Sequence, residues 1–481
     1  MLPFIVPQAT IIAPNFTGFD LSLDGIEVTQ GIQCFDTGKG LSACPDNSLP
    51  LVAGKSTAAR IYLKYTGLFG SMNNVPVRFY IRFLGGSWQT ATAYGKAVHT
   101  LDQGANDSAN VFFYVTTPSS AAVQMYAVVD PDGNYSETNE GNNRYPSSGY
   151  ITLNFQQRTS LTIVGDRLRY HPSGYTGSQY AGGWAVNGGA ATWLNQVLPL
   201  ANNAVDYSVA SGYLDWTTSL GSGSGQHSLI QTLNTNWVLQ NAFSRWFTGP
   251  FVGADHVYGW VPNAGYSGGH ADMPVYPHAG GLGVVAIGTD RAGTSTDDPG
   301  GGALIFGHEL VHDYNVKHTN TADSCGSSDN SSTFPYSSSS IQEYGFNPIT
   351  GKIYAPANTH DLMSYCPASG SKEGWISPYT WSTMFTNLSP GLQTYYRSER
   401  GLTIGYLMPT AAQESLVVNA TIFNPAYKPQ SPGQLNDLHR IATNVAYYPP
   451  QGDYSIELRD AKGNVLLSQP FVVNFESEYD A

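Results

Sequence analysis

Short runs of alternating hydrophobic and polar residues fill the first part of the chain. Such alternation is typical of half-buried β-strands, and no helical periodicity interrupts it. It predicts an immunoglobulin-like β-sandwich over residues 21–157, preceded by an apolar, proline-rich N-terminal arm over residues 1–20. The clearest runs are residues 58–65, 75–83, 110–115 and 123–129.

The pattern changes near residue 158, where strand-like runs begin to alternate with helical ones. This alternation predicts an α/β domain with a largely parallel sheet over residues 158–403. Alternating runs then return and predict a small C-terminal β-sandwich over residues 404–481. The expected fold class is multidomain, with a central α/β domain between two all-β domains. Strands are expected at residues 161–164, 205–209, 256–261 and 283–288, and helices at residues 189–198, 227–247 and 377–387.

The segment GHELVHDYNVKH, residues 307–318, concentrates groups that bind metals and transfer protons. His308 and His312 are four residues apart, so on a helix both imidazoles lie on one face, about 6 Å apart along the axis. Glu309 projects beside them, where it can accept a proton from a metal-bound water. The strand expected at residues 283–288 could form the rim of the cleft and pair with an extended peptide; the alternative is an ordinary strand of the sheet.

A third histidine makes this pattern much more specific than the first two alone. His318 can turn back to the same ion if the helix ends near Asn315, because Asn tolerates the left-handed conformation that such an end requires. A zinc site for hydrolysis needs three protein ligands and one open position. The segment therefore predicts Zn²⁺ as a cofactor.

Together with THDLMSYC, residues 359–366, the histidine motif resembles the metzincin clan of zinc endopeptidases. The resemblance implies a metzincin-like central domain in which Met363 forms an apolar floor under the three histidines. Tyr365 falls where some families place a tyrosine that ligates zinc or stabilises the oxyanion. Asn315 departs from the Gly that most members carry. A link from Cys325 to Cys366 would resemble the pappalysin-like branch.

The predicted N-terminal sandwich contains an acidic, Asn-rich turn over residues 130–143. This turn resembles that of the immunoglobulin-like, cell-adhesion-related domains of prokaryotic surface proteins. Asp130, Asp132, Asn134 and Glu137 could hold Ca²⁺, because hard cations bind clustered oxygens. The alternative is a polar turn whose side chains bond their own backbone.

Four cysteines are present, and we expect two disulfides, Cys34–Cys44 and Cys325–Cys366. The alternatives are free buried thiols, or a Cys34 or Cys44 thiolate that masks the zinc in a latent form. Disulfides favour an extracellular protein, secreted or at the cell surface. N-glycosylation sequons agree with export without proving it, and they occur at Asn15, Asn106, Asn134, Asn330, Asn387 and Asn419.

The net charge and the hydropathy of the chain limit the classes of partner that it can bind. The net charge of −13 argues against nucleic acid, because no basic stripe can neutralise phosphates. No apolar run approaches the length of a membrane span. The sequence therefore predicts a zinc endopeptidase that acts on a protein or peptide substrate. The alternative is an adhesive or structural surface protein whose metzincin-like domain only binds, through cell-surface components or self-association of its β-sandwiches.

Overall fold

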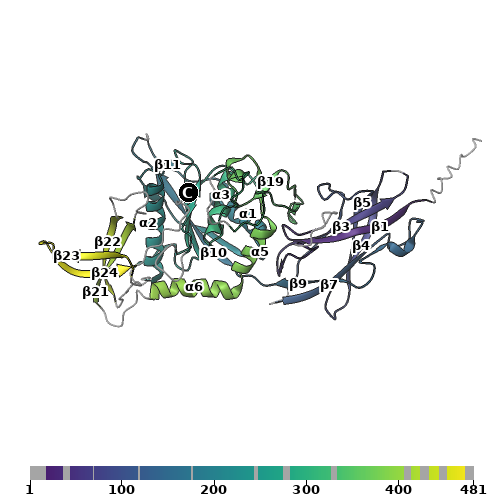
Figure 1. Ribbon diagram of the computed structural model, residues 1–481, viewed down its shortest axis with the longest axis horizontal. Helices are drawn as coiled ribbons and strands as arrows, with labels where there is room; N and C mark the ends of the chain where they lie inside the picture. The colour runs from purple at the N-terminus through teal and green to yellow at the C-terminus, as the bar shows by residue number, and fades with distance from the viewer. Residues whose placement is uncertain are drawn as a thin grey trace, which may run out of the picture.

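A computed structural model shows three parts in a row, with an α/β part in the middle (Figure 1). Most of the predicted N-terminal arm lies outside the described residues. The structure describes residues 18–35, 44–68, 70–116, 120–174, 177–242, 247–274, 282–326, 333–405, 413–422, 433–443 and 452–471.

The first part is one sheet of nine strands that curls into a near-barrel. Its strands alternate inward apolar and outward polar residues, as the sequence predicts. The sandwich prediction differs in one respect: β5 pairs with both β3 and β4, so the two layers share one hydrogen-bonded sheet. The strands are β1 (Asp20–Thr29), β2 (Leu51–Val52), β3 (Thr57–Thr66), β4 (Ser71–Phe83), β5 (Gln89–Val98), β6 (Ala109–Phe113), β7 (Ser120–Val129), β8 (Arg144–Tyr145) and β9 (Ile151–Gln156).

The central part is a seven-stranded sheet with helices on both faces. Strand β10 pairs in parallel with β12, β13 and β14, and β14 pairs in parallel with β16. Two short strands run antiparallel, β15 against β16 and β11 against β10. The strands are β10 (Leu161–Tyr170), β11 (Gln179–Tyr180), β12 (Val205–Val209), β13 (Leu214–Trp216), β14 (His256–Val261), β15 (Gly269–Ala271) and β16 (Val285–Thr289).

Successive side chains of β14 enter different cores, because neighbouring residues of a strand face opposite sides of the sheet. Tyr258 and Trp260 pack in the core beneath α1 (Ala190–Val197) and α3 (Gly300–His312). Val257 and Val261 pack in the core beneath α2 (Gly223–Ala242). The sheet is therefore the middle of three layers.

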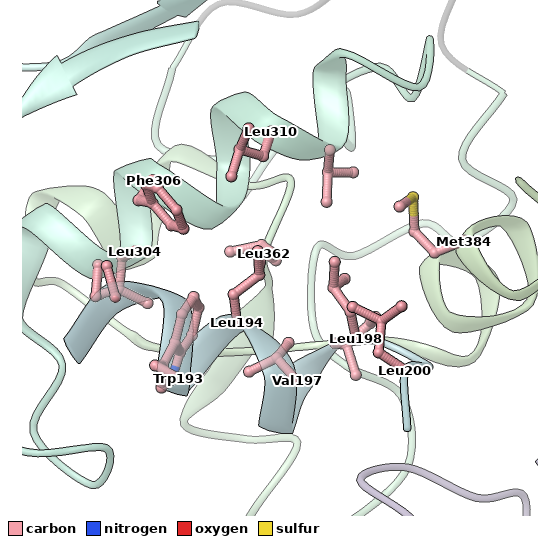
Figure 2. Packing of buried hydrophobic residues seen from close by; sticks show 14 of the residues in the cluster. Trp193, Leu194, Val197, Leu198, Leu200, Leu304, Phe306, Leu310, Leu362 and Met384 are labelled. Carbon is pink, nitrogen blue, oxygen red and sulfur yellow. The ribbon is translucent and has the colours of Figure 1, made fainter. Parts of the chain in front are cut away.

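Helix α3 lies directly above α1, and their apolar side chains interdigitate (Figure 2). Gly307 permits this approach, because a Cβ there would lie 2.7 Å from the ring of Trp193. On the sheet side, Phe306 stacks on Trp260 with ring centroids 5.4 Å apart. Such aromatic pairs contribute about 1 kcal/mol beyond their buried area. This packing fixes the helix that carries the histidine motif.

After α3 the chain forms short paired strands and three more helices. Helix α5 begins at Pro378, where the side chain of Ser377 accepts a hydrogen bond from the Thr380 amide. This start agrees with the sequence-based expectation. The elements are β17 (Gly345–Phe346), β18 (Ile353–Tyr354), β19 (Thr359–Asp361), α4 (Tyr365–Ser369), β20 (Glu373–Trp375), α5 (Pro378–Asn387) and α6 (Pro390–Gly405).

The C-terminal part contains two hairpins in the residues that the structure describes. They are β21 (Gln413–Ile422) with β22 (Gly433–Thr443), and β23 (Tyr454–Arg459) with β24 (Val465–Phe471). The remainder of the predicted small β-sandwich lies outside the described residues. Across the described parts of the whole chain, no helix combines the length and apolar character that crossing a membrane requires.

The core of the central part also includes residues from two stretches of the N-terminal part, 31–35 and 44–55. Ile32, Cys34, Leu49 and Val52 belong to the same buried cluster as α1 and α3. Backbone carbonyls of these stretches accept indole hydrogen bonds across the boundary: Trp375 donates to Gly31 and Trp381 donates to Pro50. The first sheet has its own core and packs against the central core through these two stretches.

Lys55 crosses the same boundary with its charged end. The Nζ atom donates to the carbonyl oxygens of Asn195 and Gln196, 2.8 and 3.1 Å away, at the C-terminal end of α1. Helix C-termini favour cations. Burial nevertheless lowers the pKa of Lys55 from 10.5 to about 7. Desolvation of the ammonium therefore outweighs the two hydrogen bonds.

This burial predicts a pH dependence of stability. Above about pH 7 the folded protein releases the Lys55 proton, whereas the unfolded chain keeps it up to about pH 10.5. The free energy of unfolding should therefore rise with pH in this interval, by about 1.4 kcal/mol per unit from this residue. Urea unfolding at several pH values should show this slope in the wild type but not in Lys55→Met. Lys64→Met, at an exposed lysine, should keep it; equal slopes in all three would contradict the assignment.

Candidate metal centre

The last turns of α3 carry His308, Glu309 and His312, all of them buried. Their helical spacing places both histidines toward the segment that follows the helix. The C-terminal end of a helix has a partial negative charge and favours a nearby cation. The local geometry of α3 thus brings ligands and favourable electrostatics to one place.

The helix ends at the turn that the sequence predicts. Asn315 has a φ of 58°, in the left-handed region, and its amide donates to the carbonyl oxygen of His312. The chain then reverses, and His318 returns to the two helical histidines. The amide of Thr319 donates to the carbonyl oxygen of Met363, and this hydrogen bond anchors the segment that carries His318.

The three imidazoles meet through their Nε2 atoms. Each pair of Nε2 atoms among His308, His312 and His318 is 3.1 Å apart. His308 and His312 donate their Nδ1 hydrogens to the carbonyl oxygens of Leu362 and Val316, both at 2.7 Å. Carbonyl oxygens only accept, so in neutral imidazoles both Nε2 atoms present lone pairs to one another.

Lone pairs that face each other at this distance repel unless a positive charge lies between them. A single proton can bridge only one of the three contacts. Neighbouring nitrogens of tetrahedral zinc, with bonds of about 2.0–2.1 Å, lie about 3.3 Å apart, close to the observed separation. The three histidines could therefore hold a metal ion such as zinc. Among the described residues, no other group of three His, Cys, Asp or Glu side chains has ligand atoms this close together.

Glu309 lies beside the triad and against the edge strand β15. A Cβ on Gly269 would lie 2.5 Å from Oε1 of Glu309, so only glycine leaves room for this carboxylate. Burial first, and then the nearby Glu309 charge, raise the pKa of Tyr258 well above its usual value. Tyr258 therefore remains a neutral phenol behind the glutamate.

The position of β15 corrects the prediction that the strand at residues 283–288 forms the rim of the cleft. The strand expected at residues 283–288 forms as β16, but it lies between β14 and β15 with both edges paired. It therefore cannot accept an added peptide strand. The edge is β15, in a stretch whose glycines and polar residues resemble a loop in sequence, so neither periodicity nor propensity indicated it.

Met363 is fully buried in the central core, and the turn around it contacts the motif through its backbone. Leu362 accepts from His308, and Met363 accepts from Thr319. Asp361 holds this turn: its carboxylate accepts hydrogen bonds from the amides of Met363 and Ser377, each at 2.8 Å. Burial raises the pKa of Asp361, and these hydrogen bonds partly offset the rise.

Tyr365 packs against the triad, with its ring 4.4 Å from that of His318. Its hydroxyl lies 3.4 Å from Nδ1 of His318, the nitrogen that faces away from the converging Nε2 atoms. The structure thus shows Tyr365 in contact with a candidate ligand's outer nitrogen. Both expected disulfides are present, Cys34–Cys44 and Cys325–Cys366, and the second ties the loop after His318 to the residue after Tyr365.

Sequence reasoning did not identify a buried network behind the motif. His256, the first residue of β14, has Nδ1 2.9 Å from the Asp313 carboxylate and Nε2 2.9 Å from the Tyr314 hydroxyl. Asp313 follows His312 directly, so its position in the motif was a usable signal. His256 lies far away in sequence, and no local pattern distinguished it.

Carboxylates of the acidic turn that were predicted to bind calcium have partners within the protein. The Asp130 carboxylate accepts from the amides of Asn134 and Tyr135. Asp132 forms an ion pair with Arg78. Glu137 accepts from the amide of Leu21 and from Asn143. Three of the four residues predicted to bind calcium, Asp130, Asp132 and Glu137, therefore have partners in the protein, and the calcium site with Asn134 stays a prediction.

Comparisons with known proteins leave the motif as the basis of the metzincin resemblance. No protein-family model matches the sequence, and no curated protein matches it. One solved structure that matches is the CARDB domain of the PF1109 protein from Pyrococcus furiosus in complex with di-metal ions. Its identity is 18%, over 30% of this chain and 93% of that one, with a TM-score of 0.17. Another is a family 76 glycoside hydrolase from a bovine Bacteroides thetaiotaomicron strain, 11% identical over 37% of this chain and 33% of that one, with a TM-score of 0.15. At these TM-scores neither match carries an argument about fold or function.

The left-handed turn predicts how position 315 tolerates substitution. Asn315→Gly should keep the metal affinity, because glycine adopts positive φ without strain. Asn315→Val should weaken zinc binding about tenfold, because a β-branched residue in this conformation costs at least about 1–2 kcal/mol. Competition with a chromogenic chelator measures both affinities. Equal affinity of the valine variant and the wild type would contradict the role of the turn.

Proposed function

We propose that this protein is a zinc-dependent endopeptidase. The observation that carries the proposal is the convergence of three Nε2 atoms, two of them fixed as lone-pair donors by backbone carbonyls. Zinc is the ion that suits three imidazoles with an open fourth position. Zinc bound there would polarise the scissile carbonyl and lower the pKa of the attacking water.

Glu309 is the general base of this proposal. Its carboxylate accepts the proton of the attacking water and later delivers it to the leaving amine, as bond cleavage requires both transfers. Glu309 is buried beside the three histidines. A site that only binds metal would not need a carboxylate at this position. This role distinguishes a peptidase from a metal-storage or purely adhesive protein.

Tyr365 and Met363 support the ligands. The Tyr365 hydroxyl is close enough to Nδ1 of His318 to orient its imidazole, and such outer contacts tune metal ligands. The resemblance to metzincins adds a second role for Tyr365, donation of a hydrogen bond to the oxyanion. Met363 contributes through the buried turn that holds His308 and Thr319.

We further propose that the protein acts outside the cell, secreted or at the cell surface. Its two disulfides are typical of proteins in an oxidising compartment. The Cys325–Cys366 disulfide closes the segment between His318 and Tyr365, so an oxidising environment also holds the site together. The substrate class that fits an open zinc site with a general base is a protein or peptide.

Substitution of the general base tests the mechanism. Glu309→Gln should lower the rate of casein cleavage by a factor of about 10³ or more, because the carboxylate is the only proposed proton acceptor. The variant should still bind one zinc ion, because Glu309 is not a ligand. Glu457→Gln, in the C-terminal hairpin, is the matched control and should keep full activity.

Metal removal tests the same proposal from the other side. A chelator should abolish casein cleavage by the wild type, and added Zn²⁺ should restore it. Casein cleavage that persists in Glu309→Gln, or after complete chelation of the metal, would contradict the proposal. Zinc binding without any cleavage would support the binding alternative instead.

Gly269 predicts a separable effect on the base. Gly269→Ala places a methyl group 2.5 Å from Oε1 of Glu309 and from Cγ2 of Ile305, so one of them must move. Casein cleavage should fall about tenfold or more, while zinc affinity should stay unchanged, because misplacement of a catalytic group by even 1 Å is costly. Gly391→Ala, at a site with open space around it, is the control. Unaltered cleavage by Gly269→Ala would show that the carboxylate does not need this position.

A further inference from the structure

The outer face of the N-terminal sheet carries a layer of aromatic rings and arginines, which we call the arginine–aromatic face. Its members come from β4, β7, β8 and the turns before β5 and β9, so neighbouring strands bring together residues that are distant in sequence. The opposite side of the same strands is buried in the N-terminal core. The face consists of Tyr80, Arg82, Trp88, Tyr126, Arg144 and Tyr150.

The rings form one contiguous group. Tyr80 and Tyr126 sit opposite each other in the ladder and stack with centroids 4.3 Å apart and planes within 4°. Trp88 meets the edge of Tyr126 at 4.9 Å and lies 5.0 Å from Tyr150. The side chain of Tyr150 is 42% exposed, so the group reaches solvent.

Both guanidinium groups lie on these rings. The Cζ atom of Arg82 is 4.3 Å from the centre of Trp88, and that of Arg144 is 4.4 Å from the centre of Tyr126. Gln124 accepts from Nε of Arg82, and backbone carbonyls of residues 146 and 149 accept from Arg144. These contacts fix the planar groups before any partner arrives, which lowers the entropy cost of binding.

The face is cationic in an acidic protein. The chain has a net charge of −13, yet β4, β5, β7, β8 and β9 contain no Asp or Glu. Among the described residues, the salt bridges found on this face join Arg78 to Asp132, and none joins Arg82 or Arg144 to a carboxylate. The two guanidinium groups thus have no acidic partner among the residues that the structure describes.

We propose that the arginine–aromatic face binds an acidic polypeptide segment. Arginine forks match carboxylates in geometry and charge. Trp, Tyr and Arg are also the residues that dominate binding energy in protein–protein interfaces. In the proposed endopeptidase this face recruits acidic protein substrates away from the metal centre. That recruiting role rests on the proposed function, whereas the binding does not.

Binding is measured separately from cleavage. The probe is a fluorescein-labelled oligoglutamate peptide, titrated with the full-length Glu309→Gln protein and followed by fluorescence anisotropy. Binding should weaken steeply with added salt, because exposed charges are screened. A peptide with glutamine in place of glutamate should not bind.

Variants of the two arginines locate the site. Arg82→Gln combined with Arg144→Gln should weaken oligoglutamate binding about tenfold or more, because two charge-assisted contacts are lost. Arg169→Gln combined with Arg459→Gln, at exposed arginines outside this face, should leave the affinity unchanged. Thermal unfolding of each variant checks the fold.

Several outcomes overturn the proposal. Unchanged affinity in the Arg82 and Arg144 double variant would place binding elsewhere. A lowered unfolding temperature without a change in affinity would show that the face only stabilises the sheet. Tighter binding of polygalacturonate than of oligoglutamate, with the same dependence on the arginines, would identify an acidic polysaccharide as the ligand. Unchanged cleavage of an acidic protein substrate by the double variant would overturn the recruiting role, whereas the mechanism is tested separately by the loss of casein cleavage in Glu309→Gln.

Discussion

Three imidazole nitrogens that meet 3.1 Å apart are the constraint on which the rest of the structure depends. Neutral histidines with their Nδ1 hydrogens committed to carbonyl oxygens present lone pairs to one another, so a cation at the centre would stabilise this arrangement. The surrounding protein must therefore hold three side chains against a mutual repulsion that a bound metal ion such as zinc would relieve. Backbone carbonyls, rather than flexible side chains, set the orientation of two of these rings.

The positions of those carbonyls come from the central core. Leu362 lies in a turn that Asp361 ties to the start of α5, and the carbonyls of Gly31 and Pro50 accept hydrogen bonds from the tryptophans on either side of that start. The N-terminal part is therefore connected through packing to the turn that orients His308. Its outer face, with Arg82 and Arg144 stacked on aromatic rings, is free of that structural task and carries the charge expected of a binding surface.

The sequence left some features undetermined for identifiable physical reasons. The acidic turn has a composition that suits a calcium site, and this composition is the same whether its oxygens face an ion or their own amides. The Asp130 carboxylate accepts hydrogen bonds from two amides of its turn. Strand β15 could not be predicted from the sequence, because a three-residue edge strand with glycine at its start shows no periodicity. His256 and Asp313 meet only after β14 is placed beneath the end of α3.

The sequence by itself determined what depends on local spacing. The histidine spacing, the left-handed Asn315, the Ser377 cap and the parallel β/α order follow from contacts or patterns that neighbouring residues impose. Only the tertiary structure decided which strand forms the sheet edge, which carbonyls orient His308, and that Ile32 and Leu49 belong to the central core. These depend on contacts between residues that are distant in the chain, and such contacts leave no periodic signal because each is set by the packing of whole elements.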